Sequence, residues 1–355
     1  MNLTSGSIWL AAKLNAHATP NHRTSHEGAV PRLGGIGPVC AIILLFIVTW
    51  SAFPTLQRLI GISPVDVIPW QQGVLFLALG IGGFTLGLLD DLGRLPTLGK
   101  LLGQFVLACL PAGLGVVIHE VEWPYFGTVE LPYFLGALLS GLWVVLIMNV
   151  YNFMDGINGL AGRALETFGY GLLLMTLNLS FRYQFSILAC IMLGAALGFL
   201  RHNIAVPTRT FLGDCGSQGL GAMMAAAALM VHNNDNGLGF HDPFLPFVIL
   251  LFPLIFDVCL TLIRRSLKGK NLLQPHREHL YQRYLVCIGE KHDRCLSFVS
   301  NFLYTSAILA PIYFRFYPGN GPLRLILIGI AVGMMIFQWH RVLRLEEQRP
   351  SALVK

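Results

Sequence analysis

The sequence is poor in charge. Of its 355 residues, 12% are Asp, Glu, Lys or Arg, 54% are hydrophobic, and the mean hydropathy is +0.63. Soluble globular domains carry about 25% charged residues, so this composition excludes an ordinary soluble protein. The first residues also lack the charged, apolar and small-residue order of a cleaved signal peptide. The chain is therefore predicted to be an integral membrane protein.

Paired cysteines and repeats are absent as well. None of the seven cysteines belongs to a C-x-x-C pair, and Cys40, Cys109, Cys190 and Cys259 lie in apolar runs. A thiol in such a run acts as a small hydrophobe, so neither a disulfide framework nor a zinc framework is expected. Without low-complexity tracts or repeats of fixed period, residues 1–355 are expected to form one domain.

Long apolar runs are what the sequence does contain. About ten of them approach the roughly 20 residues that cross the hydrocarbon core of a bilayer, and several carry the closely spaced glycines of tightly packed membrane helices. The predicted fold class is all-α, a polytopic helical bundle of about ten transmembrane helices. The runs are residues 36–56, 72–89, 99–118, 133–151, 159–178, 183–200, 217–231, 243–263, 296–314 and 321–340.

Positive charge is concentrated in alternate loops, which hold 20 of the 24 Lys and Arg residues. Loops rich in Lys and Arg stay in the cytoplasm, so these loops and both termini are predicted to be cytoplasmic. Anionic lipid headgroups then account for the net charge of +6, and no nucleic-acid partner is needed. The cytoplasmic segments are 1–35, 90–100, 152–163, 201–216, 264–295 (the longest loop between runs) and 341–355.

Two adjacent acids, Asp90 and Asp91, follow the second run, with Lys100 at the start of the third. Like charges about 4 Å apart repel by roughly 4 kcal/mol at an effective dielectric near 20. A bound cation or a shared proton would relieve that repulsion. The alternative is that both acids simply end a helix among solvated headgroups.

The fourth run leads into Asn149-x-x-Asn152-x-x-Asp155-Gly156-x-Asn158-Gly159. Amides and a carboxylate suit the recognition of a base or a sugar by directed hydrogen bonds, although Asn and Gly are also common in ordinary turns.

Asn203, Pro207 and the sequence Gly213-Asp214-Cys215-Gly216-Ser217 precede the seventh run. A carboxylate beside the backbone N–H groups of a helix N-terminus can hold a phosphate together with its metal. The alternative is a capping turn that uses Asp214 or Ser217.

The longest loop carries His276, Arg277 and His279. Such groups can clamp phosphates or donate protons near neutral pH, and a zinc site is less favoured because no third ligand is suitably spaced. A lipid-facing basic loop is the alternative, and it is the favoured interpretation of residues 264–270. Asp257, inside the eighth run, is expected to pair with Arg264 or Arg265, because an unpaired acid is costly at membrane depth.

Taken together and in this order, these motifs resemble the polyprenyl-phosphate N-acetylhexosamine-1-phosphate transferase superfamily, glycosyltransferase family 4. The resemblance covers about residues 20–340 and includes the segments Pro20–His26 and Pro31–Gly35. It implies transfer of a sugar 1-phosphate from a UDP-sugar to undecaprenyl phosphate, with release of UMP. The implied cofactor is Mg²⁺, with Mn²⁺ as an alternative, and the implied location is the cytoplasmic face of a bacterial inner membrane.

The resemblance also assigns roles by position. The catalytic residues would be Asp90, Asp91, Asp155 and His279; the substrate-binding residues Lys100, Asn152, Gly156, Asn158, Asn203, His276 and Arg277; and the metal ligands Asp214 and Asp91. The expected partners are the two substrates and the lipid bilayer, and a homodimer is left open. We expect direct displacement with Asp90 keeping the lipid phosphate deprotonated, with a covalent route through Asp90 or Asp91 as the alternative.

The last loop departs from the cell-wall members that use UDP-muramyl-pentapeptide, because His276-Arg277-Glu278-His279 is no run of consecutive His. It looks more like members that start O-antigen or related surface glycans, which implies a UDP-N-acetylhexosamine donor. A multi-span transporter and an inactive assembly scaffold are the rival interpretations. Transporters place their acids near the membrane midplane, whereas here the acids lie at the ends of runs and, apart from Asp257, the runs are nearly free of carboxylates. The retained Asp90, Asp91, Asp155 and Asp214 count against an inactive scaffold.

Overall fold

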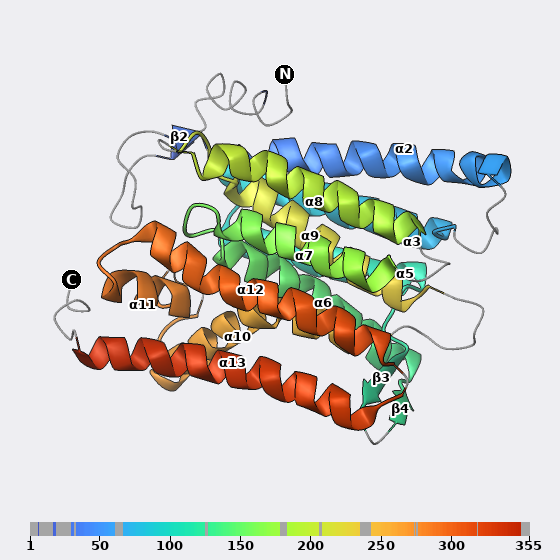
Figure 1. Cartoon of the computed structure of the whole chain (residues 1–355). Coiled ribbons are helices and arrows are strands. Elements are labelled where there is room, and N and C mark those ends of the chain that lie inside the picture. Colours follow the sequence, from blue (N-terminus) through green and yellow to red (C-terminus); the bar gives the residue numbers. More distant parts are fainter. Residues whose placement is uncertain are drawn as a thin grey trace.

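The computed structural model describes residues 6, 17–18, 30–31, 33–60, 67–124, 127–177, 183–205, 208–234, 243–272, 274, 276–317 and 319–348. Long helices lie side by side in a bundle (Figure 1). The helices are α2 (Ile36–Ile60), α3 (Trp70–Asp91), α4 (Thr97–Ala108), α5 (Leu110–Leu114), α6 (Tyr133–Phe153), α7 (Leu160–Thr176), α8 (Tyr183–Asn203), α9 (Gly213–His232), α10 (Leu245–Leu267), α11 (Leu280–Cys287), α12 (His292–Arg315) and α13 (Gly321–Gln348).

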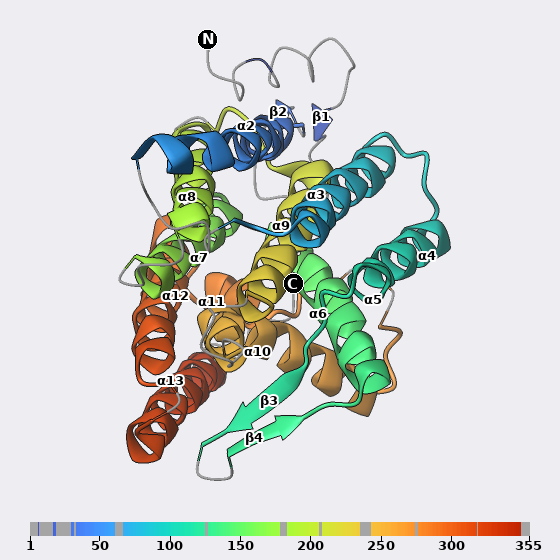
Figure 2. The ribbon, with the colours of Figure 1, turned by 90° about the vertical axis from the view of Figure 1, so that its right-hand side faces the viewer.

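Two small antiparallel sheets accompany the helices. Strand β1 (His17–Ala18) pairs with β2 (Val30–Pro31), and β3 (Glu120–Trp123) pairs with β4 (Gly127–Glu130). The second sheet is a hairpin between α5 and α6 that projects beside α13 (Figure 2). The sequence did not predict it, because four-residue strands leave too short an alternation to stand out between apolar runs.

The predicted helical bundle is confirmed, with a helix at each of the ten apolar runs. Within the described residues, seven helices are long and apolar enough to cross a membrane. They are α2 over Ile36–Leu59, α3, α6, α8, α10, α12 and α13. The remaining runs correspond to α7, to α9 and to the short pair α4 and α5.

Helix α9 lies at the centre of the bundle, packed against α3 and α6 (Figure 2). Every residue from Cys215 to His232 is buried. Lipid therefore does not contact this helix, and Gly and Ala can replace the large apolar residues that a lipid-facing surface requires. This explains why α9 falls below the apolarity of a lipid-exposed span.

The prediction of one continuous helix over residues 99–118 is wrong. Helix α4 ends at Ala108, the short α5 begins at Leu110, and Gly115 terminates α5 at φ +71°. Pro111 has no backbone N–H and cannot continue the hydrogen-bond ladder of α4. The break leaves α4 as a separate short helix whose first turn carries Lys100.

Close backbone contacts fix the N-terminal end of α9. A Cβ atom on Gly87 of α3 would lie 2.0 Å from the carbonyl oxygen of Asp214, and one on Gly35 would lie 2.2 Å from Cα of Gly216. Only glycine permits these approaches. The end of α3, with its two acids, is thereby brought against the first turn of α9.

Candidate active site

Side chains from four helices (α3, α4, α6 and α11) and from the segments after α6 and before α11 surround a cavity of about 400 Å³, at the end of the bundle where α3 and α6 end and α4 and α9 begin. Figure 1 places α11 at this same end. The lining residues are Asp90, Lys100, Leu101, Gln104, Asn149, Asn152, Phe153, Asp155, Gly156, Leu272, Gln274, His276, His279, Tyr281 and Gln282. The structure therefore gathers motifs that lie up to 192 positions apart in the sequence.

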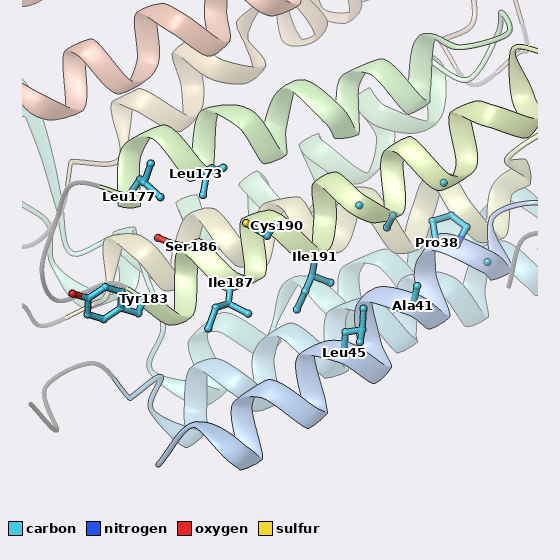
Figure 3. A pocket seen from close by; sticks show the side chains of 14 residues that line it. Pro38, Ala41, Leu45, Leu173, Leu177, Tyr183, Ser186, Ile187, Cys190 and Ile191 are labelled. Atoms are coloured by element: carbon cyan, nitrogen blue, oxygen red, sulfur yellow. The ribbon is translucent and has the colours of Figure 1, made fainter. Parts of the chain in front are cut away.

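A larger cavity of about 690 Å³ lies between α2, α7 and α8 (Figure 3). Its lining includes Ala41, Leu45, Leu173, Ile187 and Ile191, and no Asp, Glu, Lys or Arg side chain is among its lining residues. Nothing in this lining could neutralise a phosphate. The smaller cavity is therefore the candidate active site.

Lys100 is the electrostatic centre of the site. Its ammonium nitrogen Nζ donates to Asp90 Oδ2 at 2.6 Å and to Asp214 Oδ2 at 2.7 Å. One cation thus holds two carboxylates from α3 and α9, and the Lys100 side chain is only 17% exposed. The repulsion was predicted between Asp90 and Asp91, and Lys100 neutralises Asp90 but contacts Asp214 rather than Asp91.

Asp91 faces a different partner from Asp90. Its carboxylate accepts the backbone N–H groups of Asp214 at 3.1 Å and Cys215 at 2.8 Å. It therefore caps α9 from a neighbouring helix and stabilises the positive end of the helix dipole. The alternative of a cap supplied by Asp214 or Ser217 is wrong, because no side chain within the α9 segment caps it.

Asn152, from the last turn of α6, completes the cluster. Its Nδ2 donates to Asp214 Oδ1 at 2.9 Å and to Ser217 Oγ at 2.7 Å. Asp214 is consequently held by Lys100 on one carboxylate oxygen and by Asn152 on the other. Asp214 is not among the cavity-lining residues, although its side chain keeps 34% exposure beside Lys100, which is.

Asp155 and Gly156 lie in the turn that follows α6. Burial raises the pKa of Asp155 well above its usual range, the carboxylates of Asp214 and Asp91 raise it further, and a hydrogen bond from the Gly213 backbone opposes the rise. A Cβ on Gly156 would lie 2.0 Å from the hydroxyl oxygen of Tyr281. Glycine at this position keeps the turn close to α11.

Asn158 and Asn203 are not among the cavity-lining residues. Asn158 donates to the hydroxyl of Thr208 at 2.6 Å, while buried Asn203 accepts the backbone N–H of Gly159 at 2.6 Å and donates to the Thr210 carbonyl at 2.9 Å. Both amides therefore tie the turn after α6 to the segment before α9. Their predicted contact with substrate stays a prediction.

His276 and His279 line the cavity from the segment that leads into α11. Their ring centroids are 4.9 Å apart, and the His279 ring lies 5.4 Å from that of Phe153. Burial lowers the pKa of His276 to about 4, with His279 and Arg265 adding to the effect. His276 is therefore neutral near pH 7, whereas a cationic phosphate clamp would need its protonated form. Arg277 is exposed and outside the lining.

The pairing predicted for Asp257 is wrong. Its carboxylate accepts the backbone N–H of Leu280 at 2.7 Å and of Tyr281 at 3.2 Å, and contacts His279 Nδ1 at 3.3 Å. Arg265 instead pairs with Glu278. The first N–H groups of α11 have no partner within their own helix, so they bind the buried carboxylate of Asp257 in place of a basic residue nearer the headgroups.

Three lining features escaped the sequence interpretation. Gln104 had no assigned role, Asn149 was noted only as part of its motif, and Tyr281 with Gln282 belongs to α11, which was predicted as loop. Gln282 at the third position of α11 bonds back to the His279 backbone, and this capping spacing was the available signal. The N-terminal motif Pro20–His26 and Arg32 lie outside the described residues.

The donor set fits a magnesium ion that shares its coordination with substrate phosphates. No group of three His, Cys, Asp or Glu side chains is assembled as a metal cage in the described ranges. Magnesium usually needs only one or two carboxylates plus phosphate oxygens and water. Asp90 and Asp214 offer two carboxylates that already share one cation, the Lys100 ammonium.

Known proteins resemble the chain along most of its length. Residues 73–232 match glycosyl transferase family 4. The decaprenyl-phosphate N-acetylglucosaminephosphotransferase of Mycobacterium tuberculosis is 33% identical over 302 residues, which cover 80% of this chain and 72% of that protein. The probable undecaprenyl-phosphate N-acetylglucosaminyl 1-phosphate transferase of Bacillus subtilis is 25% identical over 80% of this chain and 73% of that protein. The phospho-N-acetylmuramoyl-pentapeptide-transferase of Geobacillus kaustophilus is 31% identical over a region that covers 58% of this chain and 63% of that protein.

The helical membrane bundle and its charged cavity define a multi-pass membrane enzyme that handles phosphorylated substrates. The chain belongs to glycosyl transferase family 4, within the polyprenyl-phosphate N-acetylhexosamine-1-phosphate transferase superfamily, and it is a phosphoglycosyltransferase.

Proposed function

We propose that the protein transfers a sugar 1-phosphate from a UDP-N-acetylhexosamine to undecaprenyl phosphate at the cytoplasmic face of a bacterial inner membrane. The shared contact of Lys100 with Asp90 and Asp214 supports this most. An ammonium that already balances two carboxylates can shift toward phosphate oxygens when a ligand arrives. The loops with most of the basic residues end at this site, which supports the cytoplasmic location.

In the proposed reaction, a phosphate oxygen of the lipid attacks the β-phosphorus of the donor. The bond from that phosphorus to the bridging oxygen breaks, UMP leaves with the bridging oxygen, and a sugar–diphosphate–lipid remains. Both reactants are anionic, so catalysis consists mainly of positioning and of charge neutralisation. Asp90, at the cavity wall, would keep the lipid phosphate deprotonated, and Lys100 would neutralise the approaching phosphates.

Magnesium, or manganese in its place, would be held by Asp214 together with substrate oxygens and would supply positive charge to the diphosphate. Asn152 would orient the Asp214 carboxylate through its 2.9 Å hydrogen bond. Asp91 is bound to the first N–H groups of α9 and would hold Asp214 in place. The catalytic and metal-binding roles predicted for Asp91 stay predictions.

N-acetylglucosamine 1-phosphate is the proposed group transferred. Two of the relatives are named for N-acetylglucosamine, and the His276-Arg277-Glu278-His279 sequence lacks the His run of muramyl-pentapeptide enzymes. The product would be the first lipid-linked intermediate of a surface glycan such as O-antigen.

Purified protein in detergent tests the proposal with undecaprenyl phosphate and a panel of UDP-N-acetylglucosamine, UDP-N-acetylgalactosamine and UDP-muramyl-pentapeptide. UMP release and the lipid-linked sugar are measured with Mg²⁺, with Mn²⁺ and with chelator. We expect release with UDP-N-acetylglucosamine that needs both lipid and metal. Folded protein that releases no UMP from any donor would refute the activity, and release from the muramyl donor alone would refute the sugar assignment.

A further inference from the structure

A second row of polar side chains lies one helical turn below the charged cluster. The upper row is defined as Lys100 on α4, Asn152 on α6 and Asp214 on α9. The lower row is defined as Gln104, Asn149 and Gln218 on the same three helices. Members of each pair are three or four residues apart, so each lower side chain lies on the same helix face as its upper partner.

The lower row forms its own hydrogen-bonded chain. Asn149 Nδ2 donates to Gln104 Oε1 at 2.9 Å, and Gln104 Nε2 donates to Gln218 Oε1 at 2.8 Å. Asn149 also donates to the carbonyl of Val145 in its own helix at 2.8 Å. The chain therefore links α6 to α4 and α4 to α9 by neutral hydrogen bonds.

Water has little access to these amides. Gln104 is 1% exposed and Gln218 is 0% exposed, although Gln104 and Asn149 still reach the floor of the cavity. Amides enclosed among helices need partners within the protein. A Cβ on Gly83 would lie 2.7 Å from the Gln218 carbonyl oxygen, so α3 also blocks movement of this turn of α9.

The two rows differ in how they respond to a ligand. The upper row is held together by Lys100, whose contacts with Asp90 and Asp214 must change when a phosphate or a cation arrives. The lower row carries no charge and competes for neither ligand. It can therefore hold the three helices in register while the upper contacts are exchanged.

We infer that Gln104 and Gln218, which are bonded to each other and through Gln104 to Asn149, are positioning residues for the transfer reaction. They fix α4, α6 and α9 so that Lys100, Asn152 and Asp214 meet the reacting phosphates in one arrangement. This inference rests on the proposed function for its kinetic consequence, and on the hydrogen bonds of the two rows for its structural consequence.

The kinetic test uses Gln104→Leu and Gln218→Leu, which keep size but remove the hydrogen bonds. Misplacement of reacting groups by about 1 Å can cost up to a hundredfold in rate, so we expect kcat to fall by about ten- to a hundredfold while KM for the UDP-sugar stays within about threefold. The double variant should be little worse than either single one, because both interrupt one chain. Gln338→Leu, at a buried glutamine of α13 outside both rows, is the matched control and should keep its kcat.

Crystal structures of Gln104→Leu and Gln338→Leu provide a second test that needs no activity. We expect the 2.7 Å contact between Lys100 Nζ and Asp214 Oδ2 to be lost in Gln104→Leu and kept in Gln338→Leu. An unchanged upper row in Gln104→Leu, or a kcat within about twofold of the control, would overturn the inference. Wild-type protein that releases no UMP would refute the proposed function instead, and the structural comparison would still decide the role of the lower row.

Discussion

The two sides of the cavity use charge differently. The first wall is formed by the ends of α3, α4 and α6, and its Lys100 shares one ammonium between Asp90 and Asp214 of the adjoining α9. The second wall is formed by the start of α11 with Leu272, Gln274, His276 and His279. Behind it, the carboxylate of Asp257 in α10 is occupied by the backbone N–H groups that begin α11. The first arrangement can exchange partners, whereas the second fixes the shape of the chain.

The first wall should therefore act mainly in catalysis, and the second wall mainly in the stability of the fold. Ion contacts that open toward a cavity can be replaced by phosphate or metal contacts, so changes on the first wall should lower kcat more than stability. Helix caps and buried ion pairs cannot be exchanged without loosening the fold. Changes on the second wall should therefore lower stability and affect catalysis through the shape of the cavity.

Lys100→Met should have the largest effect on catalysis. The change leaves Asp90 and Asp214 without their shared cation and removes a positive charge from the approaching phosphates. We expect kcat for UMP release to fall by about a thousandfold with a small change in the thermal unfolding midpoint. Lys268→Met, at an exposed residue directly after α10, is the control, and equal kcat values for the two variants would contradict the role of the first wall.

Asp257→Ala should lower both the stability of the protein and its kcat. The start of α11 loses its cap, which typically costs about 1–2 kcal/mol of stability, and His279 loses a contact. We expect a lower unfolding midpoint and a kcat about tenfold lower. Asp257→Asn keeps one carbonyl acceptor but turns an NH₂ group toward a backbone N–H, so its unfolding midpoint should lie between those of Asp257→Ala and wild type. An Ala variant as stable as wild type would argue against the cap.

The ion pair between Arg283 of α11 and Glu346 of α13 should affect stability alone. The side chains are only 9% and 12% exposed, and breaking a buried pair on one side costs about 3 kcal/mol. We expect Arg283→Met and Glu346→Gln each to lower the unfolding midpoint, and the double variant to recover part of the loss. Purely additive losses would show that the two residues do not act as a pair.

His276→Gln should have the smallest effect, visible only in acid. The pKa of His276 is lowered to about 4 in the folded protein, against about 6.5 for a free histidine, so folding favours the neutral ring. The free energy of unfolding therefore keeps its full value above about pH 6.5, and it decreases as the pH falls from about 6.5 to about 4, where the unfolded chain binds a proton that the folded chain does not. Unfolding midpoints across this window should fall less steeply in His276→Gln than in wild type or in His340→Gln, an exposed histidine of α13. Identical slopes would contradict the shift.

The sequence predicted the helical class, because long apolar runs are a local signal. The family resemblance assigned Asp90, Lys100, Asn152 and Asp214 to one site, and the structure brings these four side chains together. The sequence did not predict that Lys100 bridges two carboxylates, since that contact depends on how α3, α4 and α9 lie against one another. The close approach of α3 to α9 in turn depends on Gly87, whose role becomes visible only when the second helix is present.

Burial by neighbouring helices also hid several features. Helix α9 is enclosed and therefore needs little apolarity, and Asp257 finds its partners in α11, 23 residues further on. The lower row could not be recognised, because Gln104 and Gln218 lie 114 positions apart. Each of these contacts joins segments that are far apart in the sequence, so no regular spacing of residues indicates it.

UMP release by wild type and by Asp214→Asn, measured with undecaprenyl phosphate over a range of Mg²⁺ concentrations, tests the central claim most directly. Asp293→Asn is the matched control, because Asp293 is likewise an acid in the first turn of a helix, α12. The account predicts lipid- and metal-dependent release by wild type and the control, and a rate at least about a hundredfold lower for Asp214→Asn. Release by Asp214→Asn at the wild-type rate would contradict it.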